Sequence, residues 1–241
     1  GRHYFTMQEI RGTEFTTQIR AVHWASEPDQ WHPGADGTTF RDLIQTFHQV
    51  CVTMAYAHSR GVIHRDLKPD NIMIGGFGDV LVVDWGLAKL IGRAEEPGFD
   101  AVESDRSQDD GFATRMGTVA GTPAYMSPEQ AHGQTDLIGT ASDIYTLGAI
   151  LYELLGGIPP FVGSSGTKIV EKVQTSRPPS LSVDHVEEGS VEPHEMDAMD
   201  RRTRLPLALV QVCERAMQRD IADRYATAED LAVGVRAWLD G

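Results

Sequence analysis

The sequence predicts an α+β domain that is mainly helical, with a few short strands placed around one dense polar loop. Apolar residues recur at helical spacing over long stretches, whereas the runs that favour strands are short. Residues 63–71 gather an imidazole, a guanidinium, an ammonium, two carboxylates and an amide around a proline. Polar groups this dense, on a loop between apolar flanks, indicate a site for chemistry on a charged substrate.

The elements before this loop are expected to be a strand, two helices and a connection. Residues 3–10 are rich in aromatic and β-favouring side chains and predict a strand. A helix is expected to begin within 14–22, and the stretch 26–39 holds enough Pro and Gly to predict a loop. Over 40–58 the apolar residues recur with the helical period, which predicts an amphipathic helix.

Two short apolar runs, 72–74 and 80–83, follow the polar loop with turn residues between them, so we expect a small hairpin. Asp84 comes directly after the second run, which places a carboxylate at the end of a strand. The Gly-, Asp- and Ser-rich residues 92–121 lack periodicity and predict a long connection.

The last third of the chain is expected to be helical. Thr227 is the predicted N-cap of the final helix, because acidic residues follow it in the first turn. Residues 176–204 are polar and predict a second extended loop. The helical patterns extend over 143–155, 166–174, 207–218 and 228–239.

Composition narrows the class of protein. The 241 residues carry a formal net charge of −14, which argues against nucleic acid as a partner bound through a basic surface. Cys51 and Cys213 lie far apart within apolar helical patterns, so we expect two buried thiols and no disulfide framework. No apolar run within the chain is long enough to span a membrane. A cytoplasmic location is expected, and an anchor outside these residues is left open.

Three motifs, met in chain order, resemble the second half of the protein kinase signature. Trp85 stands where the family has Phe, and Ser127 stands where it has Ala. The style of these motifs resembles bacterial members of the family. The motifs are His64-Arg65-Asp66 with Asn71 five residues after Asp66, Asp84-Trp85-Gly86, and Ser127-Pro128-Glu129.

Further residues extend the resemblance over nearly the whole chain. Lys68, two residues after Asp66, and Thr122 in a GTPAY segment resemble the Ser/Thr-specific branch of the family. Asp143 resembles the aspartate that opens the central helix of the large lobe. Arg224 resembles the arginine that pairs with the glutamate of the third motif, here Glu129.

The resemblance implies transfer of the γ-phosphate of ATP to a Ser or Thr hydroxyl of a protein substrate, in signalling. Asp66 would orient the hydroxyl or accept its proton, and Lys68 would supply positive charge to the transferring phosphate. Asn71 and Asp84 offer hard oxygen ligands suited to Mg²⁺, with Mn²⁺ as a substitute. Phosphoryl transfer needs mainly positioning and charge neutralisation, which this set of residues can supply.

The resemblance also implies a division into lobes. No Gly-rich loop, strand lysine or helix glutamate of a kinase small lobe is found in the chain. We therefore expect a truncated small lobe: residues 1–12 would be its last strand and the hinge, and residues 13–241 the large lobe, with the activation segment at 84–129. Such a fragment is expected to bind ATP weakly and to turn over little. Adenine would meet the hinge at Met7, Gln8, Glu9 and Ile10.

Two residues of the motifs imply further roles. His64 would pack near Trp85 and serve the structure rather than the reaction. Arg65, which precedes the catalytic aspartate, resembles the arginine that pairs with a phosphorylated loop residue in switched kinases. Thr118 is favoured as that phosphorylated residue, and Thr122 instead resembles a structural threonine near Asp66. The candidates for the switch are Ser104, Ser107, Thr114 and Thr118.

Two other functions stay open at this point. One is a catalytically weak or inactive module that uses the kinase scaffold for binding. The other is a small-molecule kinase of similar fold, against which Lys68 and the segment around Thr122 count. A dimer that phosphorylates itself is also left open as an assembly.

Overall fold

The computed structural model describes residues 11–27, 30–90, 121–181 and 205–241. Several predictions lie outside these ranges and are not tested by them. They are the strand at 3–10, the adenine contacts of Met7, Gln8, Glu9 and Ile10, nearly all of the connection at 92–121, most of the loop at 176–204, and the candidate phosphorylation sites Ser104, Ser107, Thr114 and Thr118.

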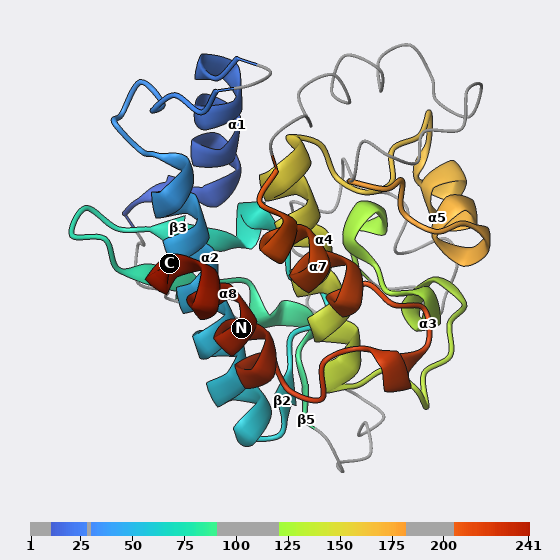
Figure 1. Cartoon of the computed structure of the whole chain (residues 1–241). Coiled ribbons are helices and arrows are strands. Elements are labelled where there is room, and N and C mark those ends of the chain that lie inside the picture. The colour runs from blue at the N-terminus through green and yellow to red at the C-terminus, as the bar shows by residue number, and fades with distance from the viewer. Residues whose placement is uncertain (1–10, 28–29, 91–120, 182–204) are drawn as a thin grey trace, which may run out of the picture.

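The domain is built around helix α4 (Thr140–Gly156). Every residue of α4 from Ser142 to its end is buried, as expected of a helix that is apolar around most of its circumference. Figure 1 shows α2 (Phe40–Ser59), α7 (Leu207–Ala216) and α8 (Ala228–Asp240) beside it, and α8 packs closely on α2. The predicted helical character of these segments is confirmed.

The remaining helices are shorter and lie around this group. Helix α5 stands apart from α2 and α8 in Figure 1. Single turns of 3₁₀ helix interrupt the loops, among them η1 at the proline of the polar loop. These elements are α1 (Phe15–Ala25), α3 (Pro128–Ala131), α5 (Gly166–Thr175), η1 (Pro69–Asn71), η2 (Trp85–Leu87), η4 (Pro123–Tyr125) and η7 (Ile221–Asp223).

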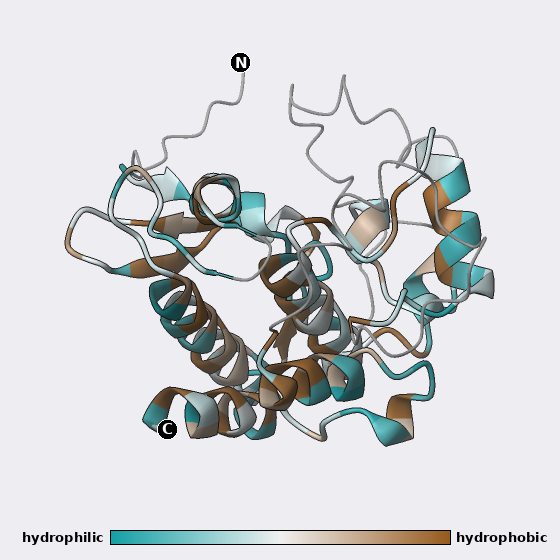
Figure 2. Ribbon diagram, turned by 45° about the horizontal axis from the view of Figure 1, so that its top comes forward, coloured by the Kyte–Doolittle hydropathy of each residue, from teal (hydrophilic) through white to brown (hydrophobic). Residues whose placement is uncertain are grey.

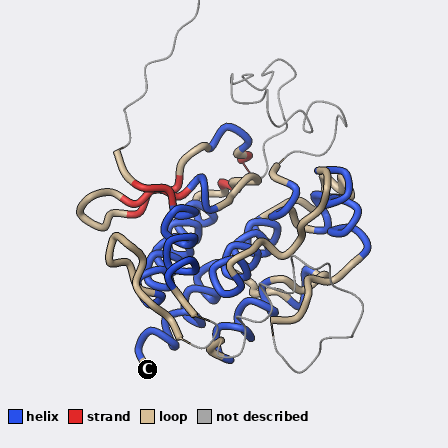
Figure 3. Tube along the Cα trace, turned by 90° about the horizontal axis from the view of Figure 1, so that it is seen from above, coloured by secondary structure: helices blue, strands red, loops and turns tan. Residues whose placement is uncertain are grey.

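The strands of the described residues are short (Figure 3). The predicted hairpin is confirmed as β3 (Ile72–Ile74) and β4 (Val80–Val82), and β1 (Thr13–Glu14) adds a third antiparallel strand beside β3. A second pair joins β2 (Val62–Ile63) to β5 (Lys89–Leu90). These two sheets flank the polar loop, since β2 enters it and β3 leaves it.

Capping residues explain where several helices begin. Thr39 and Asp42 form a capping box at α2, and the predicted N-cap Thr227 forms one with Asp230 at α8. Helix α4 begins three residues before the predicted bound of 143. The Ser142 hydroxyl accepts a hydrogen bond from the backbone N–H of Gly139, which stabilises an additional first turn.

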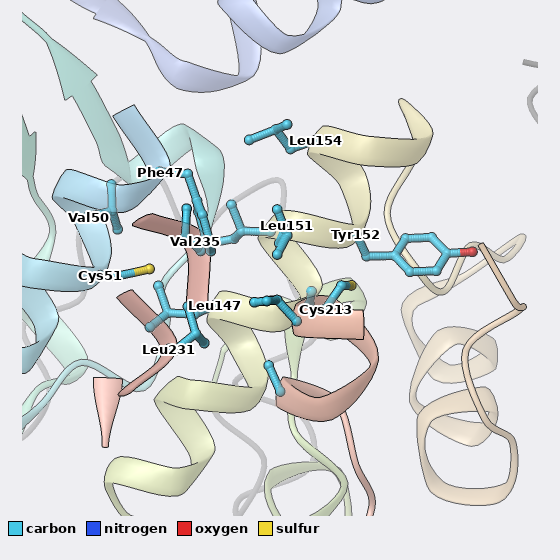
Figure 4. Close-up of a cluster of buried hydrophobic side chains, with 14 of the residues drawn as sticks. Phe47, Val50, Cys51, Leu147, Leu151, Tyr152, Leu154, Cys213, Leu231 and Val235 are labelled. Carbon is cyan, nitrogen blue, oxygen red and sulfur yellow. The ribbon is translucent and has the colours of Figure 1, made fainter. Parts of the chain in front are cut away.

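The hydrophobic core lies between α2, α4, α7 and α8, where the apolar faces of the helices turn inward (Figure 2). Figure 4 shows Cys51 and Cys213 among these side chains, and both are fully enclosed. Burial raises the pKa of both thiols well above the ordinary value, which agrees with the prediction of two buried thiols. Within the described ranges, no helix combines the length and apolar character needed to cross a bilayer.

Candidate active site

The polar loop is held in place by Asp143, which lies in the first turn of α4. Its carboxylate is 1% exposed and accepts hydrogen bonds from the backbone N–H groups of His64 (2.8 Å) and Arg65 (3.0 Å). His58 places Nε2 2.9 Å from the same carboxylate. Three partners around one buried carboxylate hold the loop in one conformation.

Arg65 has the left-handed backbone conformation, with φ of 72°, which is costly for a residue with a side chain. Its carbonyl is held on the other side by Gln130, whose side-chain Nε2 donates to it at 2.8 Å. The backbone of Arg65 is therefore hydrogen-bonded to Asp143 of α4 through its N–H and to Gln130 of α3 through its carbonyl. This arrangement sets the direction in which the next residue, Asp66, points.

Asp66, Lys68 and Thr122 form a compact hydrogen-bonded group. The backbone N–H and the hydroxyl of Thr122 both donate to Asp66 Oδ1, at 2.7 and 2.9 Å. Lys68 Nζ donates to the Thr122 hydroxyl at 2.9 Å and lies 3.8 Å from Asp66 Oδ2. One carboxylate oxygen is thus immobilised, while the other stays beside a positive charge.

Asn71 is tied to the same loop. Its side-chain Nδ2 donates to the backbone carbonyl of Asp66 at 2.8 Å, and its own carbonyl accepts from Val83 N at 2.9 Å. The second bond joins the polar loop to the residue before Asp84. The sequence-predicted residues Asp66, Lys68, Asn71 and Asp84 are therefore brought to one region by two loops.

Asp84 also has a left-handed backbone, with φ and ψ both 61°. A Cβ built on Gly86 would lie 3.2 Å from Asp84 Oδ1, so the glycine leaves room for this carboxylate. Trp85 is anchored by its indole N–H, which donates to the Val82 carbonyl at 3.0 Å. The replacement of Phe by Trp in this motif is accommodated by that bond.

His64 packs against Trp85 as predicted, with ring centroids 4.6 Å apart. Its side chain is fully buried, and Nε2 lies 3.1 Å from the Val83 carbonyl. The ring thus links the polar loop to the segment that carries Asp84, which agrees with a structural role.

The site residues fit the chemistry of a hard divalent cation. Because Asn71 Nδ2 is used by the backbone, its side-chain oxygen is the atom available to a ligand, and the Asp84 carboxylate is the natural partner for Mg²⁺. The described residues contain no group of three or more His, Cys, Asp or Glu side chains arranged to hold a metal. A cation here would thus need further oxygen ligands from a bound phosphate.

The predicted pair of Arg224 and Glu129 is confirmed. Arg224 Nη1 and Nη2 each donate to one carboxylate oxygen of Glu129 at 2.8 Å, and both side chains are buried. The Ser142 hydroxyl adds a third bond to Glu129 at 2.8 Å. Burial alone would raise the pKa of Glu129, but the hydrogen bonds and charge of Arg224 outweigh it and the pKa is lowered. The pair fixes α3 to the core.

A second buried carboxylate, Glu153 in α4, accepts a 2.6 Å hydrogen bond from the Tyr125 hydroxyl. Burial raises the pKa of Glu153, nearby Asp70 raises it further, and the Tyr125 bond and Arg20 act in the opposite direction. This contact joins η4 to the central helix just beyond Thr122.

Sequence reasoning did not assign the roles of His58, Gln130 and Glu153. Gln130 directly follows the third motif, so its position next to Glu129 was the available signal. His58 and Glu153 gave none, because each reaches its partner across many residues of chain.

Comparison with known proteins supports one family. The protein kinase domain model matches residues 4–233. The serine/threonine-protein kinase PknD of Protochlamydia amoebophila is 37% identical over 240 residues, which is 99% of this chain and 22% of that protein. PknD of Chlamydia pneumoniae is 32% identical, again over 99% of this chain and 23% of that protein. The chain therefore spans about a fifth of the length of these relatives. The chain belongs to the protein kinase domain family.

Proposed function

We propose that this chain is a fragment of the catalytic domain of a bacterial Ser/Thr protein kinase, which transfers the γ-phosphate of ATP to Ser or Thr hydroxyls of protein substrates in signalling. The observation that carries the proposal is the group formed by Asp66, Lys68 and Thr122. It combines an oriented carboxylate with a fixed ammonium, as phosphoryl transfer requires. The similarity to two PknD kinases supports the same activity.

The roles of the two carboxylate oxygens of Asp66 differ. Oδ1 is held twice by Thr122, so it orients the side chain. Oδ2 faces Lys68 at 3.8 Å and is the atom suited to accept the proton of the substrate hydroxyl. Lys68 keeps its ammonium at the edge of the site through Thr122, where it neutralises charge on the transferring phosphate.

Asn71 and Asp84 would hold Mg²⁺, or Mn²⁺ in its place, together with the phosphates of ATP. The cation, when bound, neutralises charge that develops on the β- and γ-phosphates. We further propose that residues 1–12 contain the hinge, where Met7, Gln8, Glu9 and Ile10 meet adenine, and that 13–241 form the large lobe with an activation segment at 84–129.

The proposed setting is signalling in the cytoplasm, with ATP and a protein as the partners. A second copy of the chain would phosphorylate the activation segment, with Thr118 favoured among the candidate sites. The phosphorylated residue would pair with Arg65 and so provide a switch. Mass spectrometry of the active protein tests this switch. An unmodified segment in fully active protein would rule it out.

The experiment for the function itself is transfer of radiolabelled phosphate from ATP and Mg²⁺ to a generic basic protein, followed by identification of the labelled amino acids. We expect label on serine and threonine. Label found only on added small metabolites would favour a small-molecule kinase. Nucleotide binding without transfer by the full-length natural protein would favour a binding module.

A further inference from the structure

Helix α5 packs against the rest of the domain through a hydrophobic cluster of its own. Its buried residues Val170 and Val173 belong to a cluster separate from the main core, with Met126, Ala131 and Phe161. Its principal neighbours are η4 and α3, the segment that directly follows Thr122. Because this hydrophobic cluster is small, polar contacts at the ends of α5 weigh more in fixing its position.

Arg219, between α7 and η7, binds the C-terminal end of α5. Its guanidinium donates to the backbone carbonyls of Val173 (3.0 Å), Gln174 (2.5 Å) and Ser176 (2.7 Å). Carbonyls at a helix C-terminus lack partners within the helix and carry partial negative charge. A cation with several donors is well suited to them, so Arg219 acts as a cap supplied by a distant part of the chain.

Three further contacts close this cap into a ring. The backbone carbonyl of Arg219 accepts from Arg224 Nη2 at 3.2 Å, and Arg224 binds Glu129 of α3. On the other side, the Gln174 side chain donates to the Ala131 carbonyl, at the end of α3, at 2.6 Å. The ring thus runs from α3 through Arg224 and Arg219 to α5, and returns to α3 through Gln174.

The ring is connected to the active site through α3. Gln130, between the two ring residues of that helix, donates to the Arg65 carbonyl at 2.8 Å. The start of the same segment is Thr122, bonded to Asp66. Residues 122–131 are therefore held at the catalytic aspartate at one end and at α5 at the other.

We propose that Arg219 is a positioning residue for protein-substrate binding. It fixes α5 against residues 122–131, and so keeps in place the surface over which a polypeptide must lie to bring its hydroxyl to Asp66. This inference rests on the proposed kinase function. The bonds that make up the ring involve neither Asn71 nor Asp84, the residues proposed to hold the cation and the phosphates of ATP. We therefore expect the effect to fall on the protein substrate and not on the nucleotide.

The test compares Arg219→Ala with Arg215→Ala in the full-length natural protein. Arg215 lies on the preceding helix, where its guanidinium stacks on Tyr225, 4.4 Å from the ring centroid, and it serves as the matched control. For Arg219→Ala we expect KM for the protein substrate to rise about 10-fold, with kcat and the KM for ATP within about 2-fold of wild type. Arg219→Lys should fall between, since an ammonium cannot match the fork of the guanidinium.

A double-mutant cycle with Gln174→Ala tests the ring itself. Gln174→Ala removes the bond to Ala131 and leaves the Arg219 bonds to the backbone. If the two side chains hold α5 together, the rise in KM for the double variant will be smaller than the product of the two single effects. Independent multiplication of the effects would contradict a ring, and an unchanged KM in Arg219→Ala would overturn the proposal.

Hydrogen exchange of the α5 backbone amides gives a readout that does not depend on activity. In the 241-residue chain we expect the α5 amides to exchange at least about 10-fold faster in Arg219→Ala than in Arg215→Ala, with α2 and α4 unchanged. Unchanged protection of α5 would refute the positioning role even if the protein transferred no phosphate. Absence of transfer by the full-length natural wild-type protein, with α5 loosened in the variant, would refute the kinase function alone.

Discussion

Thr122 is bonded twice to Asp66: its backbone N–H and its hydroxyl both donate to Oδ1, at 2.7 and 2.9 Å. The two residues are 56 positions apart in the chain. The same hydroxyl accepts from Lys68 Nζ at 2.9 Å, so one threonine orients both groups proposed for catalysis. Fixed orientation of this kind lowers the barrier because the reacting groups need not reorganise.

Replacement of Thr122 by Val should therefore reduce turnover. The backbone bond to Asp66 stays, but both hydroxyl bonds are lost, and we expect kcat to fall about 10- to 100-fold with the KM for ATP little changed. Thr122→Ser keeps the hydroxyl and should retain most of the activity. Steady-state kinetics of the two variants checks this, and equal losses would show that the hydroxyl is not the relevant group.

Gly121 should tolerate no side chain. Its φ is +120°, and a Cβ there would lie 3.1 Å from the Arg65 carbonyl oxygen and 3.6 Å from Asp66 Oδ1. We expect Gly121→Ala to lower kcat by at least about 10-fold, because the strained peptide before Asp66 must shift. Gly76→Ala is the control, since its Cβ would have nothing within 4 Å. Normal turnover of Gly121→Ala would contradict the described geometry.

The buried pair of Arg224 and Glu129 should contribute strongly to the free energy of unfolding. Arg224→Ala leaves a buried carboxylate without its partner, and we expect a loss of about 3–5 kcal/mol in the free energy of unfolding. Arg236→Ala breaks an exposed pair with Asp240 and should cost less than about 1 kcal/mol. Urea titrations monitored by circular dichroism measure both losses, and similar values for the two would refute the assignment.

Glu153 should make stability depend on pH. Its pKa is raised in the folded state by burial, so the folded protein holds this proton more tightly than the unfolded chain does. Its stabilising contribution is complete below the ordinary glutamate pKa of about 4.3 and is lost as pH rises through the folded-state value. The free energy of unfolding of wild type should therefore fall relative to Glu153→Gln as pH rises.

Denaturant titrations at several pH values check this, with Glu171→Gln as the control. Glu171 is 59% exposed and pairs with Lys168 at the surface, so its replacement should change the pH profile little. A difference between wild type and Glu153→Gln that stayed constant, or grew in favour of wild type as pH rose, would contradict the proposed burial effect.

Much of the fold follows from local patterns. The helix at Phe40–Ser59 and the hairpin at Ile72–Ile74 and Val80–Val82 were predictable, because apolar spacing and turn residues act over a few positions. The two-residue strands at Thr13–Glu14 and Val62–Ile63 were not. A strand that short leaves no period in the sequence, and only its distant partner defines it.

The site shows the same division. The motifs identified Asp66, Lys68, Asn71 and Asp84. The described contacts tie Lys68 to Thr122 and Asn71 to the backbone of Asp66, and the catalytic and metal-binding roles of the four residues stay predictions. The left-handed backbones at Arg65 and Asp84 could not be predicted. Arg does not favour that conformation and Asp adopts it only in some contexts, so tertiary bonds decide it at both positions. Arg219 has no local signal either, because its role depends on carbonyls more than forty residues away.

Phosphate transfer by Asp66→Asn, in the full-length natural protein, tests the central claim most directly. The substitution keeps the shape and the Oδ1 acceptor for Thr122 but removes the charge that accepts the hydroxyl proton. We expect transfer from ATP to fall at least about 100-fold, with nucleotide binding retained and with the exposed Asp136→Asn as active as wild type. Transfer by Asp66→Asn at the rate of Asp136→Asn would contradict the assignment of Asp66 as the catalytic base.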